Sequence, residues 1–280
     1  MQAPLTPIEA TSEDAAISRF AASAEGYFND PFASLFVKRH ASKSPLINRG
    51  SFTRHSFFSA FQSSPDTQII SFGAGADTRY FNKSFEFKKY FEIDFPAVTA
   101  RKISCIGKQD RLKSVIGEYT ATKTDLNGHD YSIVSGDLTK FDPILQKLIE
   151  FGLDLALPTV FFSELTFVYI KPEATTRIIE FMESFNHSIF LSMDHINPTS
   201  PFGITMIRNL QDRGIDLPGL ISFPTVQSHI DRFKVGWSVK VETLSEYFQT
   251  LDDERMLDEV EEWQLIGSHY AFLRATWKRE

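Results

Sequence analysis

Two glycines and one acid stand where a nucleotide-binding fold places them. The segment Ser71–Thr78 contains Gly73 and Gly75 and directly follows a short apolar run at 68–72. Glycine lets a ligand approach the backbone closely, although a Gly-x-Gly turn also occurs without any ligand. Asp94 ends the next apolar run, 21 residues after Gly73, and an acid at that place accepts hydrogen bonds from ribose hydroxyls. The spacing therefore favours a ligand of the nucleotide kind.

Two further acids follow strand-like segments later in the chain. Asp137 follows the apolar run at 131–135, and Glu164 follows the run at 159–163. Because open α/β sheets bind ligands at the carboxyl ends of their strands, we expect Asp94, Asp137 and Glu164 to share one edge of a sheet. A carboxylate that caps a loop or a helix is the alternative for each acid, above all for Asp137.

Two ligands compete for such a site. A dinucleotide is held near the third glycine of Gly-x-Gly-x-x-Gly, but Thr78 occupies that position here. S-adenosylmethionine carries no phosphate, and it offers ribose hydroxyls, an adenine amine, an ammonium and a carboxylate. An acid-rich pocket with separate arginines therefore suits S-adenosylmethionine better than a dinucleotide.

Other catalytic chemistries have little support in the sequence. No Gly-x-Ser-x-Gly elbow and no Walker motif occurs. The seven histidines lack metal-ligand spacing, and the one cysteine, Cys105, excludes an internal disulfide and a cysteine zinc site. We therefore expect no metal in the site.

The elements that must position these residues alternate between strands and helices. Strands are predicted over 68–72, 89–94, 131–135, 159–163, 188–193, 237–241 and 269–277. Helices are predicted over 13–28, 32–40, 47–61, 96–104, 143–151, 172–185, 202–213, 225–233 and 243–258, after a loose leader at 4–11. Strands that alternate with helices predict βαβ units and a mostly parallel sheet.

Composition describes an ordinary globular chain with an uneven distribution of charge. The 280 residues carry 29 basic and 36 acidic side chains, a net charge of −7. Nucleic-acid binding through phosphate neutralisation is therefore not expected, and no signal peptide or membrane-spanning segment is recognised. The segment 31–65 contains five basic residues and no acid, which suits an anionic ligand. The single cysteine fits a reducing compartment, and 27 phenylalanines predict an aromatic core.

Several longer motifs resemble those of the leucine carboxyl methyltransferases. The most specific are Ile47-Asn-Arg-Gly-Ser-Phe-Thr-Arg54 and Tyr90-Phe-Glu-Ile-Asp-Phe-Pro96. The resemblance runs through nearly the whole chain, and its other blocks are Gly26–Pro31, Phe72–Thr78, Gly136–Leu138, Ser163–Tyr169 and Met206–Leu210. Members of this family methylate the C-terminal leucine of type 2A protein phosphatase catalytic subunits.

The resemblance implies which residues hold S-adenosyl-L-methionine. These are Arg19, Arg54, Gly73, Gly75, Asp94, Asp137, Leu138 and Glu164. The glycines would line the cofactor with backbone, and Asp94 would hold the ribose hydroxyls. Asp137 and Leu138 would flank adenine. Glu164 would lie near the methionine part of the cofactor.

Two residues are implied to be catalytic. Arg54 would bind the carboxylate of the cofactor and also that of the substrate leucine, and Tyr169 would stand near the methyl-transfer centre. Arg19 replaces the lysine that is usual in the family. Arginine keeps the cation but is not interchangeable with lysine, so we expect Arg19 to contact the cofactor carboxylate with altered geometry.

The implied fold is an α/β class I S-adenosylmethionine-dependent methyltransferase with a Rossmann-like, mostly parallel seven-stranded sheet. One methyltransferase domain would span 1–280. It would comprise an N-terminal helical lid over 1–65, a cofactor-binding core over 66–194, a helical insertion over 195–235, and C-terminal strands with a helix over 236–280.

The implied reaction is methyl transfer to the leucine α-carboxylate of a phosphatase catalytic subunit, giving a methyl ester. The partner would be the C-terminal tail of that subunit, and we expect a cytoplasmic monomer that binds neither nucleic acid nor membrane. Two alternatives stay open. One is a related methyltransferase for a small-molecule or modified-nucleoside carboxylate, although the tRNA-modifying relatives carry a long extra domain that is not expected here. The other is a cofactor-binding phosphatase partner without turnover.

Overall fold

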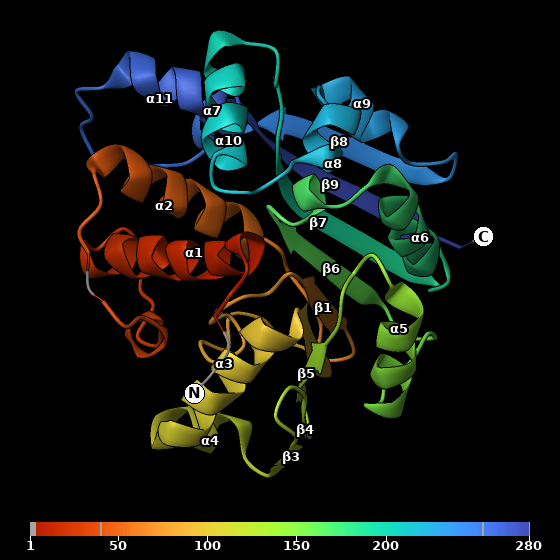
Figure 1. Cartoon of the computed structure of the whole chain (residues 1–280). Helices are drawn as coiled ribbons and strands as arrows, with labels where there is room; N and C mark the ends of the chain where they lie inside the picture. The colour runs from red at the N-terminus through yellow and green to blue at the C-terminus, as the bar shows by residue number, and fades with distance from the viewer. Residues whose placement is uncertain (1–3, 40, 254, 280) are drawn as a thin grey trace.

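A computed structural model describes residues 4–39, 41–253 and 255–279, and a twisted sheet runs through its centre (Figure 1). The described residues form nine strands in the order β3-β4-β5-β2-β1-β6-β7-β9-β8. Strands β5, β2, β1, β6 and β7 are mutually parallel, and the outer pairings are antiparallel. The strands are β1 Gln68–Phe72, β2 Lys89–Asp94, β3 Tyr119–Ala121, β4 Leu126–Gly128, β5 Tyr131–Ser135, β6 Thr159–Glu164, β7 His187–His195, β8 Trp237–Thr243 and β9 Tyr270–Lys278.

The central strands are buried on both faces, as a parallel sheet covered by helices requires. Every residue of β1 and of β5 is buried, and both strands are rich in the β-branched and aromatic residues that fit a pleated surface. Strand β1 pairs with β2 on one side and with β6 on the other, so the strand order reverses there. Open α/β sheets bind ligands at such a switch point.

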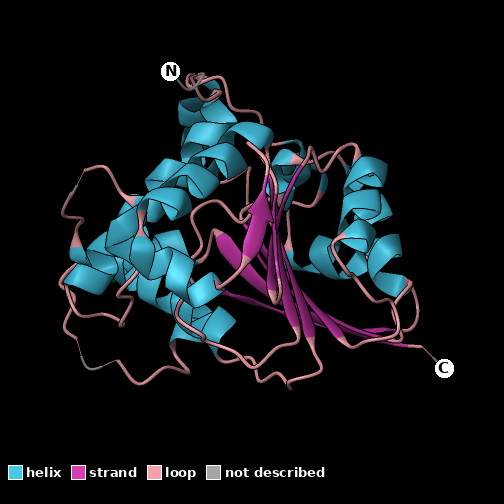
Figure 2. Ribbon diagram, turned by 90° about the horizontal axis from the view of Figure 1, so that it is seen from below, coloured by secondary structure: helices cyan, strands magenta, loops and turns pink. Residues whose placement is uncertain are grey.

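Helices cover both faces of the sheet (Figure 2). On one face lie α2 Pro45–Ser59, α3 Pro96–Lys108, α4 Asp110–Ile116, α10 Leu244–Phe248 and α11 Val260–Gly267, and on the other lie α5 Phe141–Glu150 and α6 Pro172–Glu183. The remaining helices are α1 Pro7–Ala24, η1 Ala33–Phe36, η2 Phe167–Tyr169, α7 Pro201–Gln211, α8 Pro218–Ser222 and α9 Val226–Asp231.

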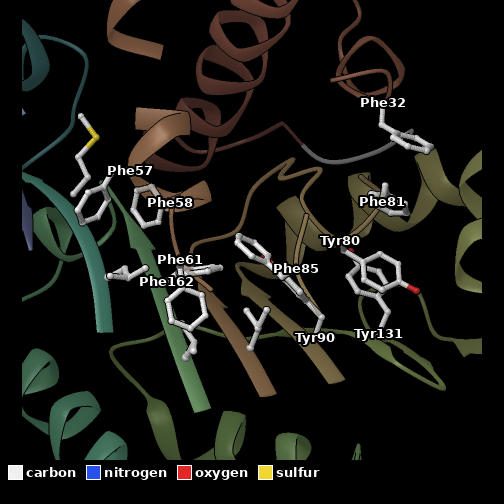
Figure 3. Packing of buried hydrophobic residues seen from close by; sticks show 14 of the residues in the cluster. Phe32, Phe57, Phe58, Phe61, Tyr80, Phe81, Phe85, Tyr90, Tyr131 and Phe162 are labelled. Atoms are coloured by element: carbon white, nitrogen blue, oxygen red, sulfur yellow. The ribbon is translucent and has the colours of Figure 1, made fainter. Parts of the chain in front are cut away.

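Aromatic side chains fill the core on the α2 side of the sheet, as the composition predicts. Figure 3 shows Phe57 and Phe58 of α2 beside Phe162 of β6. Phe58 meets Phe162 edge to face with ring centroids 5.7 Å apart, and Phe57 stacks on Phe272 of β9 at 4.3 Å. Such pairs contribute about 0.5–1.5 kcal/mol beyond the burial of their area. The rings therefore hold α2 firmly against the sheet.

Charged residues also fasten α2 to the C-terminal part of the chain. Arg49 of α2 is buried and pairs with Asp253, with Nε 3.5 Å from Oδ2. The Arg49 guanidinium also lies over the ring of Phe248 at 5.1 Å. Arg255 pairs with Asp253 at 2.6 Å and donates a hydrogen bond to the carbonyl of Gly26 at 3.0 Å. Asp253 and Arg255, which follow α10, thereby connect α2 and the turn after α1 to the C-terminal part of the chain.

The seven predicted strands are present, and the mostly parallel α/β sheet is confirmed. Strands β3 and β4 were not predicted, because three residues each give too short a pattern to recognise. The prediction of a loose leader at 4–11 is wrong. Helix α1 begins at Pro7, because Thr6 and Glu9 form a capping box ahead of the acids at 13 and 14.

Two other helix predictions also need correction. The helix expected over 32–40 is a single 3₁₀ turn, η1, and residue 40 lies outside the described part of the chain. The helix expected over 243–258 is only α10, because the described residues that follow it are irregular, and α11 begins at Val260, beyond the predicted range. Nowhere in the described ranges is a helix long and apolar enough to cross a membrane.

Candidate active site

A cavity of about 200 Å³ lies at the carboxyl edge of the sheet, where β1 and β6 meet. Helices α1 and α2 form one wall, and the segments after β1, β2 and β6 form the other. Seven of the nine candidate residues line it, namely Arg19, Arg54, Gly73, Gly75, Asp94, Glu164 and Tyr169. The structure thus brings together residues that lie up to 150 positions apart in the sequence.

The turn after β1 requires both of its glycines. Gly73 and Gly75 have φ values of 63° and 53°, in the left-handed region that disfavours side chains. A Cβ on Gly73 would lie 2.2 Å from Oγ1 of Thr166, and a Cβ on Gly75 would lie 3.3 Å from Cβ of Ser12 in α1. The turn is therefore packed between the β6 loop and the N-terminal helix, with its backbone against the cavity.

Asp94 is held by the backbone at the floor of the cavity. The amides of Gly75 and Phe95 each donate to its carboxylate at 2.7 Å. Burial nevertheless raises the pKa of Asp94 to about 6, because these two donors only partly replace water. A ligand that brings further hydrogen-bond donors would stabilise the charged form.

Glu164 is shared by two arginines. Arg54 of α2 donates from Nε to Oε2 of Glu164, and Arg79 pairs with Oε1. Burial opposes ionisation of Glu164, but the two guanidiniums outweigh it and hold its pKa below the ordinary value. The side chain of Arg54 is 27% exposed, so this cation is accessible from the cavity.

Arg19 of α1 lies in a second buried ion pair. Its Nε donates to Asp30 at 2.5 Å and to Thr78 at 3.0 Å, and its guanidinium lies over the ring of Phe28 at 5.5 Å. Its Nη2 is buried and has no hydrogen-bond partner among the described residues. A buried guanidinium nitrogen without a partner leaves an anion-binding position at the cavity wall.

Tyr169 ends η2 at the rim of the cavity, beside Thr11 of α1. Burial raises the pKa of its phenol above the ordinary value, so the hydroxyl stays protonated at neutral pH.

Helix α1 turns one face to the cavity, with Ile8, Thr11, Ser12, Ala15 and Arg19 among its residues. This is the i, i+3, i+4, i+7 spacing of a single helical face.

The polar groups of the cavity fit the parts of S-adenosylmethionine. Asp94 can accept from a ribose, Glu164 can accept from an ammonium, and the free nitrogen of Arg19 can donate to a carboxylate. The glycine turn offers backbone at close range. No group of three or more potential metal ligands occurs among the residues that the structure describes.

The sequence carries the signature of one enzyme family. The family model described as leucine carboxyl methyltransferase matches residues 8–183. The chain belongs to the leucine carboxyl methyltransferase family. It is 33% identical to leucine carboxyl methyltransferase 1 of Schizosaccharomyces pombe over 295 residues, which cover 94% of this chain and 92% of that protein. The protein is accordingly a methyltransferase.

Two other comparisons concern another relative of the chain and a solved structure with a similar fold. The chain is 30% identical to human tRNA wybutosine-synthesizing protein 4 over 96% of its own length, but it spans only 44% of that relative. Its fold resembles a crystal structure assigned to the methyltransferases of Thermobifida fusca YX, with a TM-score of 0.58 and 11% identity over 94% of each chain. That similarity supports the methyltransferase fold.

Two residues implied by the leucine carboxyl methyltransferase motifs lie outside the cavity lining. Asp137 accepts hydrogen bonds from the amide of Thr139 at 2.9 Å and from its hydroxyl at 2.7 Å. Leu138 is buried in the apolar cluster that contains Phe72 and Phe141. Their place beside adenine therefore stays a prediction, and Asp137 has the local capping contacts of the alternative.

The basic segment 31–65 does not form a single patch. Only Arg54 of its basic residues lines the cavity. Arg49 is buried against Asp253, and Lys38 pairs with Glu13 at the surface. The segment therefore delivers one cation to the site rather than a basic surface.

His55 also belongs to the site, although it was not among the predicted site residues. Its ring stacks on Phe28 at 4.1 Å, its Nδ1 has no hydrogen-bond partner among the described residues, and it lines the cavity. Burial and the nearby cations Arg19 and Arg79 lower its pKa to about 4, so the imidazole is neutral. The signal was present, because Ser51, Arg54 and His55 share one face of α2 at i, i+3 and i+4.

Proposed function

We propose that this methyltransferase transfers the methyl group of S-adenosylmethionine to a C-terminal leucine carboxylate, that of a type 2A protein phosphatase catalytic subunit. The observation that carries the proposal is the single cavity in which Arg54, Glu164 and Asp94 meet. This set supplies a cation for a carboxylate and separate acids for an ammonium and a ribose. Membership of the leucine carboxyl methyltransferase family supports the choice of acceptor.

The chemistry needs little from the side chains. S-adenosylmethionine supplies the methyl group, and its sulfonium sulfur leaves as the neutral thioether of S-adenosylhomocysteine. A C-terminal carboxylate has a pKa of about 3.3–3.7, so it is already ionised at neutral pH and needs no general base. Arg54 orients the carboxylate by charge-assisted hydrogen bonds, which also reduce its nucleophilicity. Rate enhancement then comes from alignment of the two reactants and from exclusion of water by α1.

The test uses S-adenosylmethionine labelled in its methyl group. The acceptors are phosphatase catalytic subunit with its terminal leucine and the same subunit without it. We expect base-labile label on the intact subunit and none on the truncated one, and Arg54→Ala should abolish the labelling. Label on the truncated subunit, or none on either, contradicts the proposed acceptor.

The similarity to human tRNA wybutosine-synthesizing protein 4 favours a second candidate. In that case the acceptor is the carboxylate of a modified nucleoside. The same labelled cofactor, incubated with total tRNA, distinguishes the two. Label in nucleosides together with an unlabelled phosphatase would select this second function.

A further inference from the structure

Arg79 is a buried cation that the proposed chemistry does not use. Arg79 is 1% exposed, and it does not belong to the cavity lining. The guanidinium lies over the rings of Phe58 at 5.0 Å and Phe162 at 5.7 Å. Its Nε and Nη2 have no hydrogen-bond partner within the described residues. Burial of a charge with unused donors is unfavourable unless its pairing compensates strongly.

The pairing of Arg79 joins the ends of two neighbouring strands. Its Nη1 donates to Oδ2 of Asp77 at 2.7 Å, and the same nitrogen pairs with Oε1 of Glu164. Asp77 belongs to the glycine turn after β1, and Glu164 is the last residue of β6. Both carboxylates line the cavity. The guanidinium, which does not itself line the cavity, thus pairs with two carboxylates that do.

Glu164 has two cationic partners of different character. Arg79 is enclosed and fixed by its rings, whereas the side chain of Arg54 is 27% exposed and faces the cavity. A carboxylate ligand competes with Glu164 for Arg54. If Arg54 were the sole partner, its transfer to a ligand would leave Glu164 uncompensated in a buried site.

We propose that Arg79 is a positioning residue that keeps Glu164 ionised and directed into the cavity while Arg54 binds a ligand carboxylate. The inference rests on the proposed use of S-adenosylmethionine. Arg79 then acts on the amino-acid end of the cofactor through Glu164, whose carboxylate accepts from the ammonium. A planar guanidinium that lies over two fixed rings suits this role better than a lysine, whose ammonium is a point charge on a flexible stem.

The test compares two ligands that differ only in the amino-acid end. S-adenosylhomocysteine carries the ammonium and carboxylate, whereas 5′-methylthioadenosine keeps the adenosine and lacks both. Isothermal titration on Arg79→Gln should show at least tenfold weaker binding of S-adenosylhomocysteine, because a charged contact is lost. Binding of 5′-methylthioadenosine should stay within twofold of wild type. The control Lys83→Gln, which removes a surface ion pair with Asp130, should change neither.

A double-variant cycle asks whether Arg79 acts through Glu164. Glu164→Gln should weaken S-adenosylhomocysteine by a similar factor, and adding Arg79→Gln to it should weaken binding no further. Between pH 7 and 5, Arg79→Gln should also lose affinity for S-adenosylhomocysteine more steeply than wild type, with the profile for 5′-methylthioadenosine unchanged. If Arg79→Gln does not fold, Arg79→Lys serves the same comparison, because an ammonium positions Glu164 less well.

Three outcomes would overturn the proposal. Equal weakening of both ligands shows a structural role, and unchanged binding of both shows no role. Additive losses in the cycle show that Arg79 does not act through Glu164. Failure of the proposed cofactor looks different, because wild type would then bind neither ligand, whereas failure of the proposed acceptor alone would leave the binding of both ligands intact.

Discussion

Asp94 is a carboxylate whose charge is only partly stabilised by the protein. Two backbone amides donate to it at 2.7 Å, yet burial raises its pKa to about 6. Ribose hydroxyls would donate hydrogen bonds to the ionised carboxylate of Asp94. They would not take the place of a proton bound to it. Affinity for the cofactor is therefore linked to the ionisation of this one residue.

The residue-scale prediction follows from the sign of that linkage. As pH falls below about 6, Asp94 takes up a proton, so affinity for S-adenosylhomocysteine should fall by up to tenfold per pH unit. Asp94→Ala should weaken binding at pH 7.5 by about 1.5–3 kcal/mol and remove this contribution. Isothermal titration between pH 5 and 8 measures both effects.

The control for Asp94 is Asp142→Ala. Asp142 is an exposed carboxylate in the first turn of α5 and pairs with Arg177 at the surface. The Asp142→Ala variant should bind S-adenosylhomocysteine as wild type does, with the same pH profile. An Asp94→Ala variant that matched this control would contradict the ribose role.

Whether a single residue could be predicted depends on whether its partners lie close to it in the sequence. Gly73, Gly75 and Asp94 were predictable from the sequence, because a turn after a strand and an acid at the next strand end are local patterns. Arg79 and His55 were not singled out, because their meaning depends on long-range partners. The carboxylate that Arg79 holds on β6 is 85 residues away in the chain.

Helix α1 is the element that closes the cavity. It lines the wall from Ile8 to Arg19, and the space it leaves is about 200 Å³. Sites for ligands of drug size usually measure about 300–1,000 Å³. We therefore expect helix α1 to shift outward when a cofactor enters, and its stability should influence how fast the cofactor leaves.

The element-scale prediction concerns the cap of α1. The hydroxyl of Thr6 accepts from the amide of Glu9, and the Glu9 carboxylate accepts from the amide of Thr6 at 2.7 Å. Thr6→Ala should cost about 1 kcal/mol at this end of the helix. If opening of α1 limits release, S-adenosylhomocysteine should dissociate about fivefold faster. Stopped-flow dissociation and hydrogen exchange of the α1 amides measure the change.

Helix α9 offers a matched control for the cap. Thr225 forms the same kind of capping box with Ser228, away from the cavity lining. Thr225→Ala should raise hydrogen exchange in α9 and leave the dissociation rate unchanged. Equal rates for Thr6→Ala and wild type would show that α1 does not gate the cavity.

Elements were predictable where their pattern was long. The strands from β1 to β7 were predicted, apart from β3 and β4, because buried apolar runs between turn residues are distinctive. The start of α1 was missed, since acids at 13 and 14 imitate the first turn of a helix. Phe248 and Asp253 both contact Arg49 of α2, and no local pattern reveals such long-range contacts.

At the scale of the whole molecule, Asp253 and Arg255 join α2 and the turn after α1 to the C-terminal part of the chain. The prediction is that Arg49→Met lowers the free energy of unfolding by about 3–5 kcal/mol, because it leaves the buried carboxylate of Asp253 with one partner fewer. Lys38→Met removes an exposed ion pair with Glu13 and should change the free energy of unfolding by less than about 1 kcal/mol.

Urea unfolding of both variants provides the measurement. Equal midpoints would show that the Arg49 contact does not stabilise the fold. A midpoint shift without a change of slope would show that the unfolding unit still spans the whole chain.

The position of β9 has a consequence for synthesis on the ribosome. Strand β9 comes last in sequence among the described strands, yet it is not at an edge of the sheet, because it lies between β7 and β8. It also carries Phe272, on which Phe57 of α2 stacks. Chains emerge N-terminus first, so the wall that α1 and α2 give to the cavity lacks the support of Phe272 until β9 has left the exit tunnel. We expect the aromatic face of α2 to stay uncovered until then, so that cofactor binding follows the emergence of β9.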